Sequence, residues 1–152
     1  MAAEAKAEAL VLIVSRKFEA PREAVFDAWL DPVQLSQWMG PRGVRAEIDY
    51  VEPKIGGRYR IIMHPESGGT PTVGGVYREI SRPDRLVFSW RWENAHPDGS
   101  AGIETMVTVT FEEESGLTKM TLRQEGHETK ESRDSHEHGW AGSFDKLAEA
   151  LG

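Results

Sequence analysis

Several side chains that commonly bind metals gather near the C-terminal end of the sequence. His127, His136 and His138 lie close to Asp134 and Glu137, and imidazole and carboxylate groups are common ligands of transition metals. However, positions 136 and 138 are two residues apart on a predicted helix, so their side chains diverge by about 200° and fit one ion poorly. We therefore predict no metal site, and we expect a solvated helix start in this region.

Residues suited to covalent or acid–base catalysis are scarce. The chain has no Cys, which excludes disulfides, thiolate nucleophiles and Cys-based metal sites, and no Ser or Thr lies in a nucleophile elbow. Arg78 and Glu79 are the charged candidates, because the facing of the segment 75–80 is ambiguous. A solvated charge beside a sheet edge is one alternative. The other is an inward charge that contacts a ligand, since an unpaired charge in apolar surroundings is costly.

Aromatic side chains form the largest candidate set. They fall on predicted inward faces, where they can either pack a solid core or line a cavity. The residues alone leave both alternatives open. The set consists of Trp38, Tyr59, Phe88, Trp90, Trp92, Trp140 and Phe144.

Hydrophobic periodicity predicts the elements that must position these side chains. We expect a strand over 10–18, two short helices after it, about six further strands and a helix over 130–151. The six strands are 44–50, 58–64, 75–80, 86–92, 105–111 and 118–124. Strands joined by short turns form an antiparallel sheet. The final helix carries an apolar stripe from Trp140 to Leu151 that must be buried on that sheet. The predicted fold class is therefore α+β, a curved antiparallel sheet wrapped around a long C-terminal helix.

Glycines occur at places where the backbone needs space. Gly56-Gly57 and Gly74-Gly75 do not lead from a strand into a helix, so they are not phosphate loops, and we interpret them as bends or bulges that let the sheet curve. Gly139 and Gly142 each weaken the long helix by roughly 1 kcal/mol. We expect a close approach of the helix to the sheet to explain them.

The order and spacing of several motifs resemble the SRPBCC (START-like) superfamily. Within it, the chain is most similar to the branch named after the activator of the ninety-kilodalton heat-shock protein's ATPase. The resemblance spans roughly residues 11–151 and implies a helix-grip fold with a ligand-sized cavity between sheet and helix. The motifs are Ala20-Pro21, Trp29-Leu30-Asp31-Pro32, Lys54-Ile55-Gly56-Gly57-Arg58-Tyr59, Arg85-Leu86-Val87-Phe88-Ser89-Trp90, Val107-Thr108-Val109-Thr110-Phe111 and Gly139-Trp140.

The resemblance favours a cavity over a solid core, and three functions are compatible with it. The first is binding of a small apolar or amphipathic molecule. The second is a cyclase- or hydrolase-like enzyme that uses Arg78, Glu79, Tyr59 or Tyr77 as polar groups. The third is a surface that stimulates a chaperone. Methionines suit an adaptable cavity wall, so the predicted ligand-binding residues are Trp38, Met39, Tyr59, Ile61, Met63, Arg78, Phe88, Trp90, Trp92, Met106, Met120, Trp140 and Phe144.

Composition limits the partners. The 152 residues carry a net charge of −7, which argues against binding to nucleic acid or anionic membranes, and no apolar run approaches the roughly 18 residues that span a bilayer. We expect a cytoplasmic protein with a flexible lead-in over residues 1–9, one domain over 10–152 and no cofactor. A homodimer and a chaperone partner stay open.

Overall fold

A computed structural model describes residues 10–94 and 101–151. The expected lead-in over residues 1–9 lies outside the described residues. The elements are β1 (Leu12–Phe18), α2 (Arg22–Asp27), α3 (Pro32–Trp38), β2 (Val44–Val51), β3 (Arg58–Pro65), β4 (Thr72–Ser81), β5 (Arg85–Trp92), β6 (Thr105–Glu114), β7 (Leu117–Glu125) and α4 (Lys130–Leu151).

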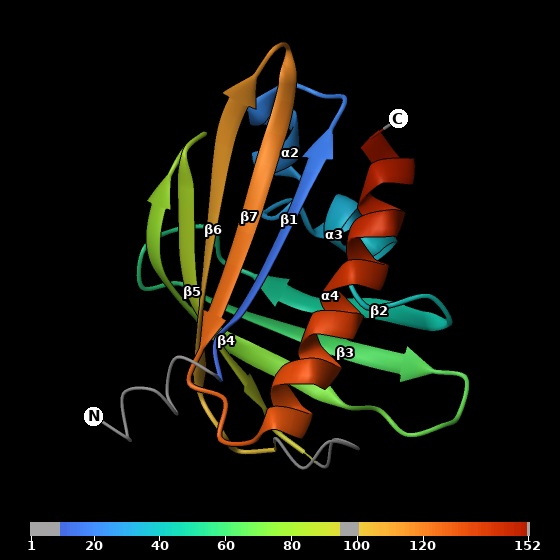
Figure 1. Ribbon diagram of the computed structural model, residues 1–152. Helices are drawn as coiled ribbons and strands as arrows, with labels where there is room; N and C mark the ends of the chain where they lie inside the picture. Colours follow the sequence, from blue (N-terminus) through green and yellow to red (C-terminus); the bar gives the residue numbers. More distant parts are fainter. Residues whose placement is uncertain (1–9, 95–100, 152) are drawn as a thin grey trace.

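The strands form one seven-stranded antiparallel sheet in the order β1-β7-β6-β5-β4-β3-β2. Helix α4 crosses the concave side of this curled sheet, and α2 and α3 lie near the C-terminal half of α4 (Figure 1). The helix-grip arrangement expected from the sequence is confirmed. Gly75 shows why glycine is needed on β4, because a Cβ atom there would lie 1.9 Å from the carbonyl oxygen of Ser89. No helix of the described segments is long and apolar enough to cross a membrane.

Two β-bulges change the facing of side chains that simple alternation predicts. Alternation along β2 places Tyr50 on the same face as Ala46, but the register with β3 shifts between Ile48 and Tyr50, and Tyr50 is exposed. A second shift separates Tyr77 from Glu79 on β4. Tyr77, before the shift, is buried opposite Phe88, and Arg78 at the shift is exposed to solvent. Beyond it, Ile80 and not Glu79 packs against the core.

The helices begin at signals present in the sequence. Asp31 accepts a hydrogen bond from the backbone N–H of Val33 at 2.9 Å, and Pro32 is the first residue of α3. This pair therefore starts α3, with Asp31 as its N-cap. Helix α4 begins after Thr129, whose hydroxyl oxygen accepts the N–H of Ser132 at 3.0 Å. Its predicted bounds are confirmed.

Candidate functional site

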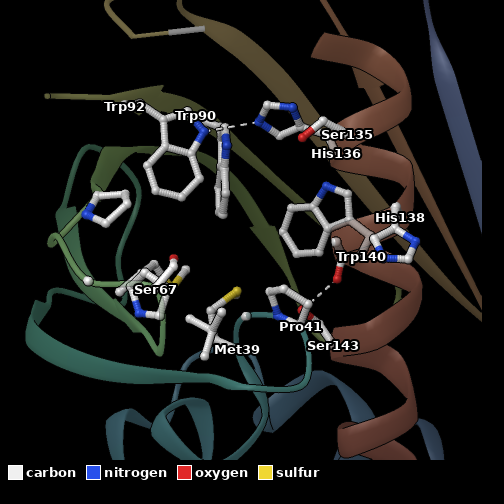
Figure 2. Close-up of a pocket in the computed structure, with 17 residues that line it drawn as sticks. Met39, Pro41, Ser67, Trp90, Trp92, Ser135, His136, His138, Trp140 and Ser143 are labelled. Atoms are coloured by element: carbon white, nitrogen blue, oxygen red, sulfur yellow. Dashed lines mark hydrogen bonds between the residues drawn. The ribbon is translucent and has the colours of Figure 1, made fainter. Parts of the chain in front are cut away.

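A cavity of about 310 Å³ lies between the N-terminal half of α4, strand β5 and two connections, α3–β2 and β3–β4 (Figure 2). Apolar and small side chains provide most of its surface. The described residues that line it are Met39, Gly40, Pro41, Val44, Met63, Pro65, Ser67, Gly68, Pro71, Trp90, Trp92, Ser135, His136, His138, Gly139, Trp140 and Ser143.

Three indole rings form the inner wall. Trp90 and Trp92 are two apart on β5, so both point to the concave face, and their rings meet edge to face with centroids 5.6 Å apart. Trp140 projects from α4 toward them, and its ring centroid lies 4.9 Å from that of Trp90. The strand and the helix thus bring together aromatic surface from positions about fifty residues apart in the chain.

A chain of buried hydrogen bonds fixes the position of Trp140. Its Nε1–H donates to Oε1 of Gln124 at 2.8 Å, and Nε2 of Gln124 donates to Oγ1 of Thr105 at 2.8 Å. The Thr105 hydroxyl in turn donates to the backbone oxygen of Trp90 at 3.1 Å. Gln124 is completely buried, so breaking this chain would leave a polar amide unsatisfied. The network therefore holds Trp140 against the β5 wall.

His136 takes part in a second polar arrangement. Its Nε2 accepts a hydrogen bond from Nε1–H of Trp92 at 3.0 Å, and its Nδ1 lies 2.8 Å from the carbonyl oxygen of Ser132. A carbonyl only accepts, so these partners assign the ring proton to Nδ1. Its ring centroid also lies 4.9 Å from that of His127. The expectation of a solvated helix start is wrong at this position, because His136 is only 7% exposed.

The side chains on the cavity wall best suited to proton transfer are two histidines, His136 and His138. None of the described residues that line the cavity is Asp, Glu, Lys or Arg. Tyr59 donates its hydroxyl to the backbone oxygen of Ser89 at 2.6 Å, and burial raises the pKa of Tyr59 and the pKa of Tyr77 above the usual range. Glu79 forms an ion pair with Arg85 at the surface. Among the described residues, no group of three or more His, Cys, Asp or Glu side chains could hold a metal ion.

Comparison with known proteins identifies the family of this chain. Residues 19–152 match the family described as Activator of Hsp90 ATPase homolog 1-like protein. The chain belongs to this family. The match covers all the described elements except β1, and it agrees with the SRPBCC-type fold of the sheet and α4.

Solved structures of similar proteins share the arrangement of this activator-like chain. A protein from Chromobacterium violaceum superimposes with a TM-score of 0.83 at 26% identity, over 93% of this chain and 96% of that one. The AHSA1 protein from Silicibacter pomeroyi gives 0.78 at 29% identity, over 93% and 96%. An Arthrobacter aurescens protein gives 0.82 at 25% identity, over 95% and 87%. No match to a curated protein was found.

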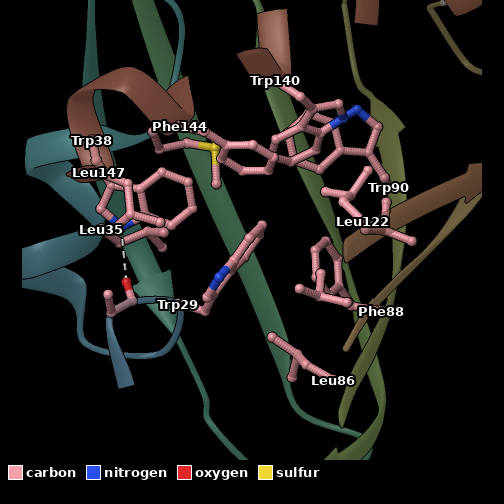
Figure 3. Close-up of a cluster of buried hydrophobic side chains, with 14 of the residues drawn as sticks. Trp29, Leu35, Trp38, Leu86, Phe88, Trp90, Leu122, Trp140, Phe144 and Leu147 are labelled. Carbon is pink, nitrogen blue, oxygen red and sulfur yellow. Dashed lines mark hydrogen bonds between the residues drawn. The ribbon is translucent and has the colours of Figure 1, made fainter. Parts of the chain in front are cut away.

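In this member of the activator-like family, the predicted ligand-binding residues divide into three groups. Five of them line the cavity, namely Met39, Met63, Trp90, Trp92 and Trp140. Six others are buried in the core beside it, as Figure 3 shows for Trp38, Phe88 and Phe144. The remaining three of these core residues are Tyr59, Ile61 and Met120.

Arg78 and Met106 do not line the cavity, which corrects the prediction for both. Arg78 is exposed because it follows the inward side chain Tyr77 and lies at the β4 bulge. Met106 lies between the buried residues Thr105 and Val107 on β6, so alternation directs it to the opposite face of the sheet.

The sequence analysis missed the residues that complete the cavity. Five of them belong to the α3–β2 and β3–β4 connections, which carry no periodic signal, namely Gly40, Pro41, Ser67, Gly68 and Pro71. Five others lie on α4, and Val44 and Pro65 lie at strand ends. The inward position of His136 could have been predicted from the sequence. It precedes Trp140 by four residues, so it continues the apolar stripe of α4 by one turn. Ser143, at the following turn, faces the same cavity.

Proposed function

We propose that this chain binds a small apolar or amphipathic molecule in the cavity beneath α4. The observation that carries the proposal is the wall of three indoles, Trp90, Trp92 and Trp140, which borders an open volume of about 310 Å³. That volume is at the lower end of the roughly 300–1,000 Å³ typical of ligand sites. A ligand there would gain the dispersion contacts that the indoles lack on their cavity side.

The hydrogen bonds around the wall support the same proposal. Trp140 and Trp92 both use their N–H groups to bond to buried protein partners, Gln124 and His136. The indole rings are therefore held in place before any ligand arrives, and preorganised groups lose less conformational entropy on binding. Such a wall suits recognition by shape and apolar contact.

The other two functions considered have less support among the described residues. A cyclase- or hydrolase-like enzyme needs a general acid or base, and no carboxylate or lysine of the described chain lines the cavity. Of the two lining histidines, His136 already has both ring nitrogens in hydrogen bonds, to Trp92 and Ser132, and His138 is exposed to solvent. A chaperone-stimulating surface would favour a contiguous exposed apolar patch. The exposed large apolar side chains instead come from four separate segments, at Ile13, Val33, Tyr50 and Ile55. A homodimer, a chaperone partner and a cytoplasmic location remain predictions.

Native mass spectrometry of protein purified from cells tests the proposal first, because a co-purifying small molecule would appear as an added mass. The second measurement is a fluorescence titration with the uncharged dye N-phenyl-naphthylamine. We expect saturable one-to-one binding by the wild type and weaker binding by Trp140→Ala.

The matched control is Phe111→Leu, because Phe111 is buried against Phe26, with ring centroids 5.2 Å apart, and does not line the cavity. It should lower stability and leave the dye affinity of the folded protein unchanged. If the folded wild type binds neither a cellular molecule nor the dye, the proposal is wrong.

A further inference from the structure

Helix α4 contains two internal glycines with different surroundings. A Cβ atom at Gly142 would lie 3.1 Å from Cβ of Pro41 and 3.2 Å from its Cα, so Gly142 allows α4 to approach the α3–β2 connection closely. A Cβ atom at Gly139 would meet no atom within 4 Å. We expected close packing of the helix against the sheet to explain both glycines. Gly142 does pack closely, although its neighbour is the α3–β2 connection and not the sheet. For Gly139 the expectation is wrong.

Gly139 faces the cavity. It lines the cavity together with His136 and Ser143, which lie three residues before it and four residues after it on the same side of the helix. A side chain at position 139 would therefore extend into the open volume between these two neighbours. Glycine within a helix is unfavourable relative to alanine, and no packing contact at this position requires it. The missing side chain at Gly139 leaves a gap in the helical wall of the cavity between His136 and Ser143, which we call the notch.

The surroundings of the notch favour a flat and uncharged ligand. Trp140 is the next residue, and Trp90 and Trp92 lie across the cavity; indoles attract aromatic rings beyond the simple burial of area. No formally charged side chain of the described residues lines the wall. The Ser143 hydroxyl already donates to the backbone oxygen of Gly139 at 3.0 Å. A charged group beside Gly139 would thus lose hydration and find further polar side chains only at Ser67, Ser135, His136 and His138.

We propose that Gly139 sets the size of the cavity, and that the ligand is a flat, uncharged aromatic molecule that contacts the α4 backbone at this notch. The inference rests on the proposed function, because it specifies the ligand class of the same cavity. It also predicts an unusual combination of effects, since a side chain at position 139 should strengthen the helix and weaken binding.

The test compares Gly139→Ala and Gly139→Leu with wild type in thermal unfolding and in titration with N-phenyl-naphthylamine. We expect Gly139→Ala to raise the Tm of the ligand-free protein by a few degrees, because helix propensity improves without a clash. Dye affinity should fall modestly in Gly139→Ala and roughly tenfold or more in Gly139→Leu. The matched control is Ala141→Gly at an exposed position of the same helix. It should lower Tm and leave affinity unchanged.

Matched probes test the ligand class. Anilinonaphthalene sulfonate has the same aromatic skeleton as the dye plus a sulfonate, and it should bind more weakly even in salt that screens the net charge of the protein. Naphthol and decanol have equal numbers of non-hydrogen atoms and one hydroxyl each. Naphthol should displace the dye at lower concentration than decanol.

The outcomes separate the inference from the function on which it rests. If the wild type binds neither a cellular molecule nor the dye, the proposed function fails and the inference fails with it. If it carries a cellular molecule and does not bind the dye, the proposed function stands and the ligand class is wrong. If the wild type binds and Gly139→Leu binds equally well, only the role of Gly139 is wrong. A lower Tm in Gly139→Ala would show that the notch is not empty space and would also overturn that role. Stronger binding of decanol or of the sulfonate would overturn the ligand class.

Discussion

The two ends of the concave face contain similar aromatic residues and have different packing. Toward the C-terminal half of α4, α3 brings Leu35 and Trp38 against Phe144, and the space is filled (Figure 3). Toward the N-terminal half, the indoles of β5 and α4 face connections that contribute prolines, glycines and Ser67, and a cavity remains. An aromatic face therefore becomes core or cavity wall according to the side chains opposite it.

Removing a ring from the filled end should have the largest effect on stability. Trp38 is fully buried and donates its Nε1–H to the backbone oxygen of Ala28 at 3.0 Å. We expect Trp38→Ala to lower the free energy of unfolding by about 3–5 kcal/mol, measured by urea denaturation. Trp38→Phe keeps an aromatic ring, so it should lower the free energy of unfolding much less. Dye affinity of the folded fraction should stay near that of wild type.

Trp140→Ala, at the end with the cavity, should lower stability less than Trp38→Ala does and should weaken dye binding more. Part of this ring already faces open volume, so we expect a loss of about 2–3 kcal/mol, including the hydrogen bond to Gln124. Dye affinity should fall roughly tenfold or more. A stability loss as large as that of Trp38→Ala, with unchanged affinity, would show that the two ends do not differ in packing.

Two conservative variants compare the indole N–H groups of β5. Trp92 donates to His136, whereas Nε1 of Trp90 is buried and has no hydrogen-bond partner among the described residues. Trp92→Phe should therefore lower the free energy of unfolding by about 1 kcal/mol more than Trp90→Phe does. Thermal and urea unfolding of both variants measure this difference. Equal losses would mean that the hydrogen bond to His136 contributes no net stability.

Lys146 lies where the two ends meet and should show the smallest effect. Its Nζ donates to the backbone oxygens of Met39 and Val44 at 3.5 and 3.2 Å. We expect Lys146→Met to change stability by less than about 1 kcal/mol at neutral pH, while loosening the α3–β2 connection and weakening dye binding slightly.

The pH dependence of this variant has a defined sign. Burial lowers the pKa of Lys146 from its usual 10.5, so between the lowered value and 10.5 the unfolded chain binds more protons than the folded one. The stability of wild type relative to Lys146→Met should therefore rise with pH in that window. Urea denaturation at several pH values measures it. A relative stability that falls with pH would contradict the assigned direction.

Periodic patterns predicted the fold well and the cavity only in part. The α4 stripe and the alternation of Trp90 and Trp92 follow from repeats of 3.6 and 2 residues, which the sequence displays directly. The facing of the segment 75–80 was ambiguous in the sequence because the β4 bulge at Arg78 places both Tyr77 and Ile80 toward the core, which strict alternation does not allow. Pro41 and Pro71 lie in connections, where position depends on tertiary contacts that no local pattern encodes.

The close contact between Gly142 and Pro41 has a kinetic consequence. It fixes the α3–β2 connection against α4, whereas the exposed lining residues are Ser67 and Gly68 on the β3–β4 connection and His138 on α4. A ligand would enter and leave between the β3–β4 connection and the helix. Substitutions at Gly68, whose φ of +95° favours glycine, should change association and dissociation rates together. Residence time in this protein could then be altered while the equilibrium constant, set by the indoles deeper inside, stays the same.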